Sequence, residues 1–229
     1  MNSAKKRLIL FDIDGTLITA GGAGTRSLDR AFHALFGIKD AFKFIEMSGK
    51  TDIQIIKEGL RLHELTGFDG NVEKMKEMYL SFLRDEVNNP WKKMKPGIAE
   101  LLAILKCRTK PLGLLTGNLE EGAGIKLSPF RLNEYFIDGA FGSDHEDRDE
   151  LLPIAIEKFS RKGFAYTPAE CIVVGDTPRD VRCAKIHGAF SVAVATGPYS
   201  KEELLRTDAD LVLDSFEDAE KCAAELGLI

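Results

Sequence analysis

The sequence predicts an α/β fold: a doubly wound, Rossmann-like parallel sheet core with a helical cap domain inserted after the first strand. Three observations lead to this prediction. Short apolar runs recur along the chain, and each is followed at once by a polar or small residue. Amphipathic segments of helical length separate most of these runs, as in folds that alternate strand and helix. One interval, between the first run and the second, shows only helical periodicity.

The strands of the core are predicted from uninterrupted apolar runs. A parallel strand is buried on both faces, so its sequence is apolar throughout and does not alternate. A sixth run, from Phe136 to Gly142, is weaker because Asp138 and Gly139 interrupt it. The five clear runs are LILF (8–11), LGLL (112–115), IVV (172–174), VAVA (192–195) and LVL (211–213). We expect helices at residues 98–106 and 151–162, and a capped helix within residues 214–226.

The interval after the first strand is predicted to be a helical module. Roughly seventy residues there carry no convincing strand, which is too many for an unstructured connection. We therefore expect a core of residues 1–19 and 90–229 and a cap of residues 20–89, joined by the segments GGAG (21–24) and NNPW (88–91). Glycine gives these joints the freedom of a hinge, although an ordinary glycine-rich loop is the alternative. The apolar faces of the three expected helices are Leu28, Phe32, Leu35 and Phe36; Ile53, Ile56 and Leu60; and Val72, Met75, Tyr79, Phe82 and Leu83.

Composition places the chain among ordinary globular proteins. It has 229 residues, 44% hydrophobic and 29% charged, with a formal net charge of -5. We expect no nucleic-acid partner and no membrane contact, because there is no basic patch and no apolar run of spanning length. The four cysteines form no C-x-x-C pair, and the four histidines are scattered, so a zinc site is not expected. A cytoplasmic monomer or homodimer fits these features.

Polar residues at the strand ends indicate where the chemistry lies. In an open parallel sheet, ligands bind beyond the carboxyl ends of the strands, so Asp12, Asp14, Thr116 and Asp176 are expected to converge. If Asp12 and Asp176 come within about 4 Å, their repulsion is about 4 kcal/mol at an effective dielectric constant of about 20. A cation must offset it, and oxygen ligands completed by water select Mg²⁺. One carboxylate could then attack phosphorus while the other handles protons.

Four ordered motifs carry a resemblance to a known family. They are DIDGTL (12–17), LLTGN (114–118), VVGDTPRD (173–180) and the tail from VAVATGPYSKEELL to ADLVLDS. Together they resemble the haloacid dehalogenase superfamily of phosphotransferases, and within it the branch similar to phosphoglycolate phosphatase. The resemblance covers nearly the whole predicted core.

The resemblance implies a role for each matching residue. Asp12 would attack phosphorus and become an aspartyl-phosphate, and Asp14 would be the general acid and base. Mg²⁺ would be held by the carboxylates of Asp12 and Asp176 and by the backbone carbonyl of Asp14. Thr116 would bind the transferred phosphoryl group, helped by the backbone N–H of Gly117.

The positive charge of the site departs from the family pattern. The usual lysine followed by proline is missing from the loop after the third core strand, where Arg148 is the available cation. Arginine binds phosphate with two parallel hydrogen bonds, so we assign the role to Arg148, with Lys158 as the fallback.

Three further residues keep two interpretations each. Asp180 either caps a helix that starts at Pro178 or supports the metal ligands. Asn118 either orients the phosphate loop or caps the following helix, and we favour the cap. In the resembled branch a loop of the cap reaches over the active site, so Lys50 is a candidate for reading the substrate, with an exposed lysine between two cap helices as the alternative.

The sequence thus predicts a Mg²⁺-dependent phosphatase that acts on a small phosphorylated metabolite, such as a phosphoglycolate-like compound or a sugar phosphate. A phosphomutase of the β-phosphoglucomutase type has the same core motifs and is the main alternative. A dehalogenase is disfavoured because its chemistry does not need Asp14. From another class, a phospho-acceptor receiver module also gathers aspartates at a sheet edge, but receivers are about half this length.

Overall fold

The computed structural model describes residues 7–65, 67–108 and 111–227, so residues 1–6 of the predicted core segment lie outside it. Its core sheet has six parallel strands in the order β5-β4-β1-β6-β7-β8. The strands are β1 (Leu8–Phe11), β4 (Leu112–Thr116), β5 (Asp138–Phe141), β6 (Cys171–Gly175), β7 (Phe190–Val194) and β8 (Leu211–Leu213). All six predicted strands are therefore present, including the weak one.

Helices cover both faces of this sheet, which confirms the doubly wound class. Successive residues of β1 point to opposite layers: Leu8 and Leu10 join one buried cluster, and Ile9 and Phe11 join the other. The first cluster is completed by α6 and α7, the second by α4, α5 and α9. The helices of the core are α4 (Ile98–Arg108), α5 (Glu120–Leu127), α6 (Leu151–Arg161), α7 (Pro178–Lys185), α8 (Lys201–Leu204) and α9 (Ala219–Glu225).

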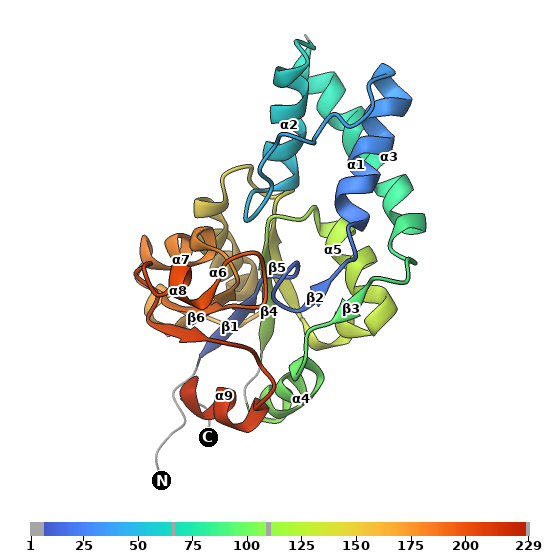
Figure 1. The fold of residues 1–229 in the computed structure, drawn as a ribbon. Helices are drawn as coiled ribbons and strands as arrows, with labels where there is room; N and C mark the ends of the chain where they lie inside the picture. Colours follow the sequence, from blue (N-terminus) through green and yellow to red (C-terminus); the bar gives the residue numbers. More distant parts are fainter. Residues whose placement is uncertain (1–6, 66, 109–110, 228–229) are drawn as a thin grey trace.

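Three helices stand beyond the carboxyl ends of the sheet strands (Figure 1). They are α1 (Ala23–Phe36), α2 (Asp52–Leu62) and α3 (Phe68–Glu86). Their predicted apolar faces pack together: Phe32, Leu60 and Met75 are all fully buried in one cluster. We call residues 20–89 the cap; the boundaries of this segment stay a prediction from the sequence.

Two short strands, which the sequence reading missed, join the cap to the core. β2 (Ile18–Thr19) and β3 (Lys93–Met94) pair antiparallel, with Ile18 opposite Met94 and Thr19 opposite Lys93. Two residues are too few to produce a periodic pattern, so no run of sequence indicated them. The side chain of Asn89 crosses between the two connections and donates to the carbonyl of Ala20 at 2.9 Å.

Candidate active site

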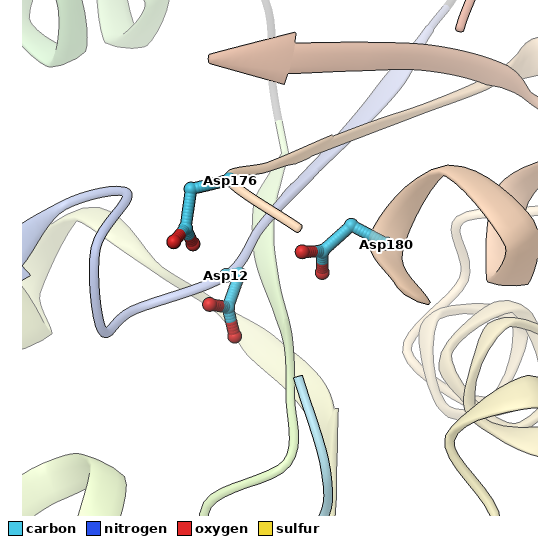
Figure 2. A group of neighbouring side chains, drawn as sticks. All are labelled: Asp12, Asp176 and Asp180. Carbon is cyan, nitrogen blue, oxygen red and sulfur yellow. The ribbon is translucent and has the colours of Figure 1, made fainter. Parts of the chain in front are cut away.

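The strand register brings the predicted carboxylates together. Phe11 of β1 lies opposite Val174 of β6, so the side chains that follow these two strands project into one space. Figure 2 shows Asp12 and Asp176 converging there from the two strand ends, with Asp180 approaching from the start of α7. Each of the three residues offers a carboxylate oxygen that lies within 4.8 Å of those of the other two. All three side chains are buried.

A tight turn after β1 shapes this edge of the sheet. The N–H of Asp12 continues the ladder by donating to Val174 O at 2.9 Å, and the chain then reverses, with Gly15 N donating to Ile18 O at 2.8 Å. Gly15 has φ +89°, and a Cβ there would lie 2.2 Å from Asp176 Oδ2. Only glycine allows both this backbone conformation and this close approach.

Burial and mutual repulsion shift Asp12 and Asp176 toward protonation by raising their pKa values. Burial raises the pKa of Asp12 to about 6, with Asp180 and Asp14 adding to the rise and Arg148 opposing it. Burial, followed by the charges of Asp12 and Asp180, raises the pKa of Asp176 well above its usual value. Protein groups alone thus leave the cluster short of positive charge near neutral pH.

The donor set fits a hard divalent cation. Asp12, Asp176 and Asp180 offer only oxygen ligands, and among the described residues no other group of three or more histidine, cysteine or acidic side chains meets at ligand distance. An ion such as Mg²⁺ prefers oxygen ligands completed by water. The excess of buried negative charge is what such an ion would neutralise.

Arg148 lies against the acid cluster, where the sequence predicted a cation. It begins a single 3-10 turn after β5, and its Nη2 is 3.0 Å from Asp12 Oδ1 and also bonds Asp180 Oδ1. Its Nη1 donates to the carbonyl of Gly49 in the cap at 3.2 Å. The fallback, Lys158 of α6, binds Asp144 instead, at 2.7 Å. The role of Arg148 toward phosphate stays a prediction.

Asp180 has the contacts of both its interpretations. Its carboxylate accepts from Thr177 N at 3.0 Å, and its own N–H is held by Thr177 Oγ1, which completes the predicted capping box of α7. The same carboxylate also binds Arg148. Capping is thereby confirmed, and support of the metal ligands stays a prediction.

The interpretation of Asn118 as a helix cap is wrong. The cap position of α5 belongs to Leu119, and no side chain bonds there. The amide of Asn118 turns instead toward the site, where Nδ2 donates to Asp14 Oδ2 at 2.9 Å and to Thr116 Oγ1 at 2.8 Å. The amide oxygen that a cap would use accepts instead from Lys126 Nζ at 2.5 Å, a charged donor that competes better for it than the exposed first turn of a short helix. The alternative interpretation, orientation of the phosphate loop, matches this geometry.

The loop of the cap before α2 rests directly on the core. Asp52 N donates to Gly117 O at 2.7 Å, and Thr51 Oγ1 donates to Glu146 O at 2.7 Å. Lys50 lines the cavity, as expected of a residue that reads the substrate, but its ammonium is bound to Glu58 Oε2 at 2.7 Å. The cap thus closes over the acid cluster.

This contact leaves no room at Gly117. A Cβ there would lie 2.1 Å from the carbonyl oxygen of Lys50, so Gly117→Ala must push the cap loop off the core. We expect kcat/KM to fall at least about 10-fold, because small misplacements of a closing element are costly. Steady-state kinetics will measure this fall. The matched control is Gly124→Ala in α5, where a Cβ meets nothing within 4 Å and activity should be kept. An equal loss in both variants would contradict the assignment.

Sequence reasoning missed two buried polar residues beside the site, Lys126 and Asp52, and placed a third, Tyr79, only on an apolar helix face. Lys126 of α5 is 5% exposed and lies next to Asp52 and Tyr79 of the cap. Burial lowers the pKa of Lys126, but the charges of Asp14, Tyr79 and Asp52 outweigh it and leave the pKa raised. A lysine on the buried face of α5, three residues after Ala123, was the available indication.

The site opens into a cavity of about 490 Å³ between cap and core. Its core side is lined by Asp12, Asp14 and Thr116, and its cap side by Leu28 and Ile55 among others.

Within the described ranges, no helix combines the length and the apolar composition that crossing a bilayer requires.

Comparison with known proteins agrees with this architecture. Phosphoglycolate phosphatase 1 of Pseudomonas aeruginosa is 24% identical over 221 residues, which cover 95% of this chain and 79% of that protein. The bifunctional riboflavin kinase/FMN phosphatase of Arabidopsis thaliana is 26% identical over 221 residues, covering 95% of this chain and 56% of that protein. The structure of CbbY from Rhodobacter sphaeroides in complex with phosphate has a TM-score of 0.75 at 20% identity, covering 93% and 96% of the two chains.

A family model separates the enzyme predicted from the sequence from the receiver module. The model of haloacid dehalogenase-like hydrolases matches residues 9–194, which include the first three of the four motifs and the first residues of the tail. The match confirms the resemblance and the prediction of an enzyme. The alternative prediction, a receiver module, is wrong. The chain belongs to the haloacid dehalogenase-like hydrolases.

Proposed function

We propose that the chain is a Mg²⁺-dependent phosphatase that hydrolyses a small phosphorylated metabolite through an aspartyl-phosphate on Asp12. The observation that carries the proposal is the convergence of Asp12 with Asp176, Asp180 and Arg148, three of which, Asp12, Asp176 and Arg148, line one cavity. Family membership supports it, as do relatives named as phosphatases.

In the first half-reaction, a carboxylate oxygen of Asp12 attacks phosphorus and the bond to the leaving oxygen breaks. Asp14 gives its proton to that oxygen, so the dephosphorylated part of the substrate leaves as an alcohol. Thr116, which bonds the Asp12 carboxylate, and the N–H of Gly117 bind the phosphoryl oxygens. Arg148 adds a fixed positive charge beside the nucleophile.

In the second half-reaction, Asp14 takes a proton from water, and the water oxygen attacks phosphorus. The bond to Asp12 breaks, inorganic phosphate leaves, and both aspartates return to their first state. Mg²⁺, when bound by the carboxylates of Asp12 and Asp176 and the carbonyl of Asp14, supplies positive charge that offsets the charge of the phosphoryl group. The cap excludes bulk water while the first step occurs.

Phosphate release from a panel of phosphorylated metabolites tests this function. With Mg²⁺ present we expect multiple turnovers on at least one phosphomonoester, and with excess EDTA we expect none. Isomerisation of a sugar phosphate without phosphate release would instead identify a phosphomutase, which needs the same core residues. Turnover that is unchanged by EDTA would contradict the metal. The cytoplasmic location and the oligomeric state stay predictions from the sequence.

Lys50 is proposed to contact the part of the substrate that leaves. We expect Lys50→Ala to raise KM about 10-fold or more with little change in kcat, because a hydrogen bond from a charged group contributes about 1.5–3 kcal/mol. Initial-rate kinetics on the best substrate of the panel measures both constants. Lys43→Ala, on the outer surface of the cap beside Phe44, is the control and should behave as wild type. A fall in kcat alone would exclude substrate binding as the role of Lys50.

A further inference from the structure

A buried lysine anchors the side chain of Asp14. The ammonium of Lys126 donates to Asp14 Oδ2 at 2.6 Å and to Asn118 Oδ1 at 2.5 Å. Asn118 Nδ2 donates to the same oxygen of Asp14 at 2.9 Å. Two donors from the core therefore fix one oxygen of a carboxyl group whose side chain is otherwise 42% exposed.

The cap supplies the other neighbours of this lysine. Asp52, at the start of α2, and Tyr79, in α3, are joined by a hydrogen bond, and both side chains act on Lys126 electrostatically. Asp52 is itself held to the core, because its Oδ2 accepts from Leu119 N at 2.9 Å. The buried carboxylate of Asp52 is thus placed between cap and core.

The charges in this cluster depend on one another. A buried ammonium without partners strongly destabilises the folded state, and so does an unpaired buried carboxylate. Lys126 balances Asp14 on the core side and Asp52 on the cap side, so the position of Lys126 responds to both. If the cap moved away, Asp52 and Tyr79 would leave with it, and Lys126 would keep only its contacts within the core.

We propose that Lys126 is a positioning residue for Asp14, and that Asp52 and Tyr79 hold Lys126 in place when the cap is closed. The inference rests on the proposed function, in which Asp14 is the general acid and base. A general acid must place the oxygen that carries its proton within about 2.6–3.2 Å of the leaving oxygen. With Oδ2 bound by two donors, Oδ1 is the oxygen left to carry that proton. Closure of the cap would then complete the orientation of the acid as well as exclude water.

Leaving-group dependence separates this role from a merely structural one. Phenolate needs a proton as it leaves, whereas p-nitrophenolate is stable without one near neutral pH. The value of kcat/KM reports the steps up to cleavage of the substrate, so it reports the step in which Asp14 acts as an acid. A misplaced acid therefore lowers kcat/KM for phenyl phosphate more than for p-nitrophenyl phosphate, while a general loss of structure lowers both equally.

The test compares these two probes, with Mg²⁺, in Lys126→Met, Asp52→Asn and Tyr79→Phe. For Lys126→Met we expect kcat/KM to fall about 100-fold with phenyl phosphate but less than about 10-fold with p-nitrophenyl phosphate, since acid catalysis contributes about 10²–10⁴-fold. The ratio of kcat/KM for p-nitrophenyl phosphate to kcat/KM for phenyl phosphate should therefore rise. Asp52→Asn should raise this ratio by a smaller factor, and Tyr79→Phe by the smallest. The matched controls are Lys185→Met, from a surface pair with Asp210, and Asp29→Asn, a cap aspartate that accepts from Phe42 N; both should leave the ratio unchanged.

Each outcome decides the proposal. Equal losses on the two probes in Lys126→Met would overturn it, and an unchanged ratio in Asp52→Asn would remove the part played by the cap. If thermal unfolding shows that Lys126→Met does not fold, Asp52→Asn and Tyr79→Phe decide alone, because both keep the shape of the side chain. Asp14→Asn serves as the reference: if it also shows no leaving-group dependence, the assignment of Asp14 fails, not that of Lys126.

Discussion

Asp12→Asn is expected to abolish turnover while leaving the fold intact. Asparagine has the same shape but lacks the anionic oxygen that attacks phosphorus, so kcat should fall at least about 10⁴-fold. Phosphate release measures the loss, and mass spectrometry of acid-quenched protein should find the covalent phosphoryl group in the wild type only. Appreciable residual turnover would defeat the assignment of the nucleophile.

Stability should respond differently from activity in this variant. Because burial raises the pKa of Asp12 to about 6 from 3.8, ionising it costs the folded state free energy. Without divalent ions, the wild type should lose this part of its stability as the pH rises from about 4 through about 6. Asp12→Asn cannot ionise and should lack that loss, which thermal unfolding at pH 5 and pH 8 in EDTA will detect. Asp144→Asn, at another strand end but outside the cavity, is the control for both measurements.

Arg148→Met should cost both stability and activity. The guanidinium is buried between Asp12 and Asp180, and removing one partner of a buried ion pair costs about 3–5 kcal/mol. For a chain of this size, each kcal/mol lowers Tm by about 2–4 °C, so we expect a fall of about 10 °C. We expect kcat/KM to fall about 10³-fold as the charge beside the nucleophile is lost. Thermal unfolding and steady-state kinetics measure the two effects.

The conservative variant shows how much of this depends on charge alone. Arg148→Lys should recover part of the activity, since the family pattern has lysine in this loop, but a single ammonium cannot reproduce the three contacts of Arg148 with Asp12, Asp180 and Gly49. Arg161→Met removes an exposed pair with Glu157 within α6 and should change Tm by little. If Arg148→Met keeps wild-type kcat/KM, its assignment to the phosphate site is wrong.

The strand-end residues could be predicted because topology alone brings them together. Asp12 and Asp176 follow apolar runs of the kind that form buried parallel strands, and adjacent parallel strands end at the same edge. No knowledge of side-chain conformation was needed. Arg148 was assigned differently, from the family resemblance, as the cation in the loop where the family pattern has lysine; that loop follows β5 at the same edge.

The residues that were missed or misassigned depend on contacts between distant segments. Asp52 follows a threonine at a helix start, where an acidic residue is ordinary, and only the packing of α2 on the core brings it to Leu119. Lys126 comes from a helix whose burial depends on the cap. Asn118 was misread because its local sequence favours a cap, while its acceptor, Asp14, lies more than a hundred residues away.

The short ribbon of β2 and β3 has a consequence for how this enzyme can change. The chain leaves the core at Thr19 and returns at Lys93, directly opposite each other in the ribbon. A tight turn joining these two positions would bridge the gap that the whole intervening segment now spans. That segment can thus be lengthened, trimmed or exchanged while Asp12, Asp14 and Asp176 keep their places on the sheet, provided that the replacement again supplies partners for Lys126 and Arg148.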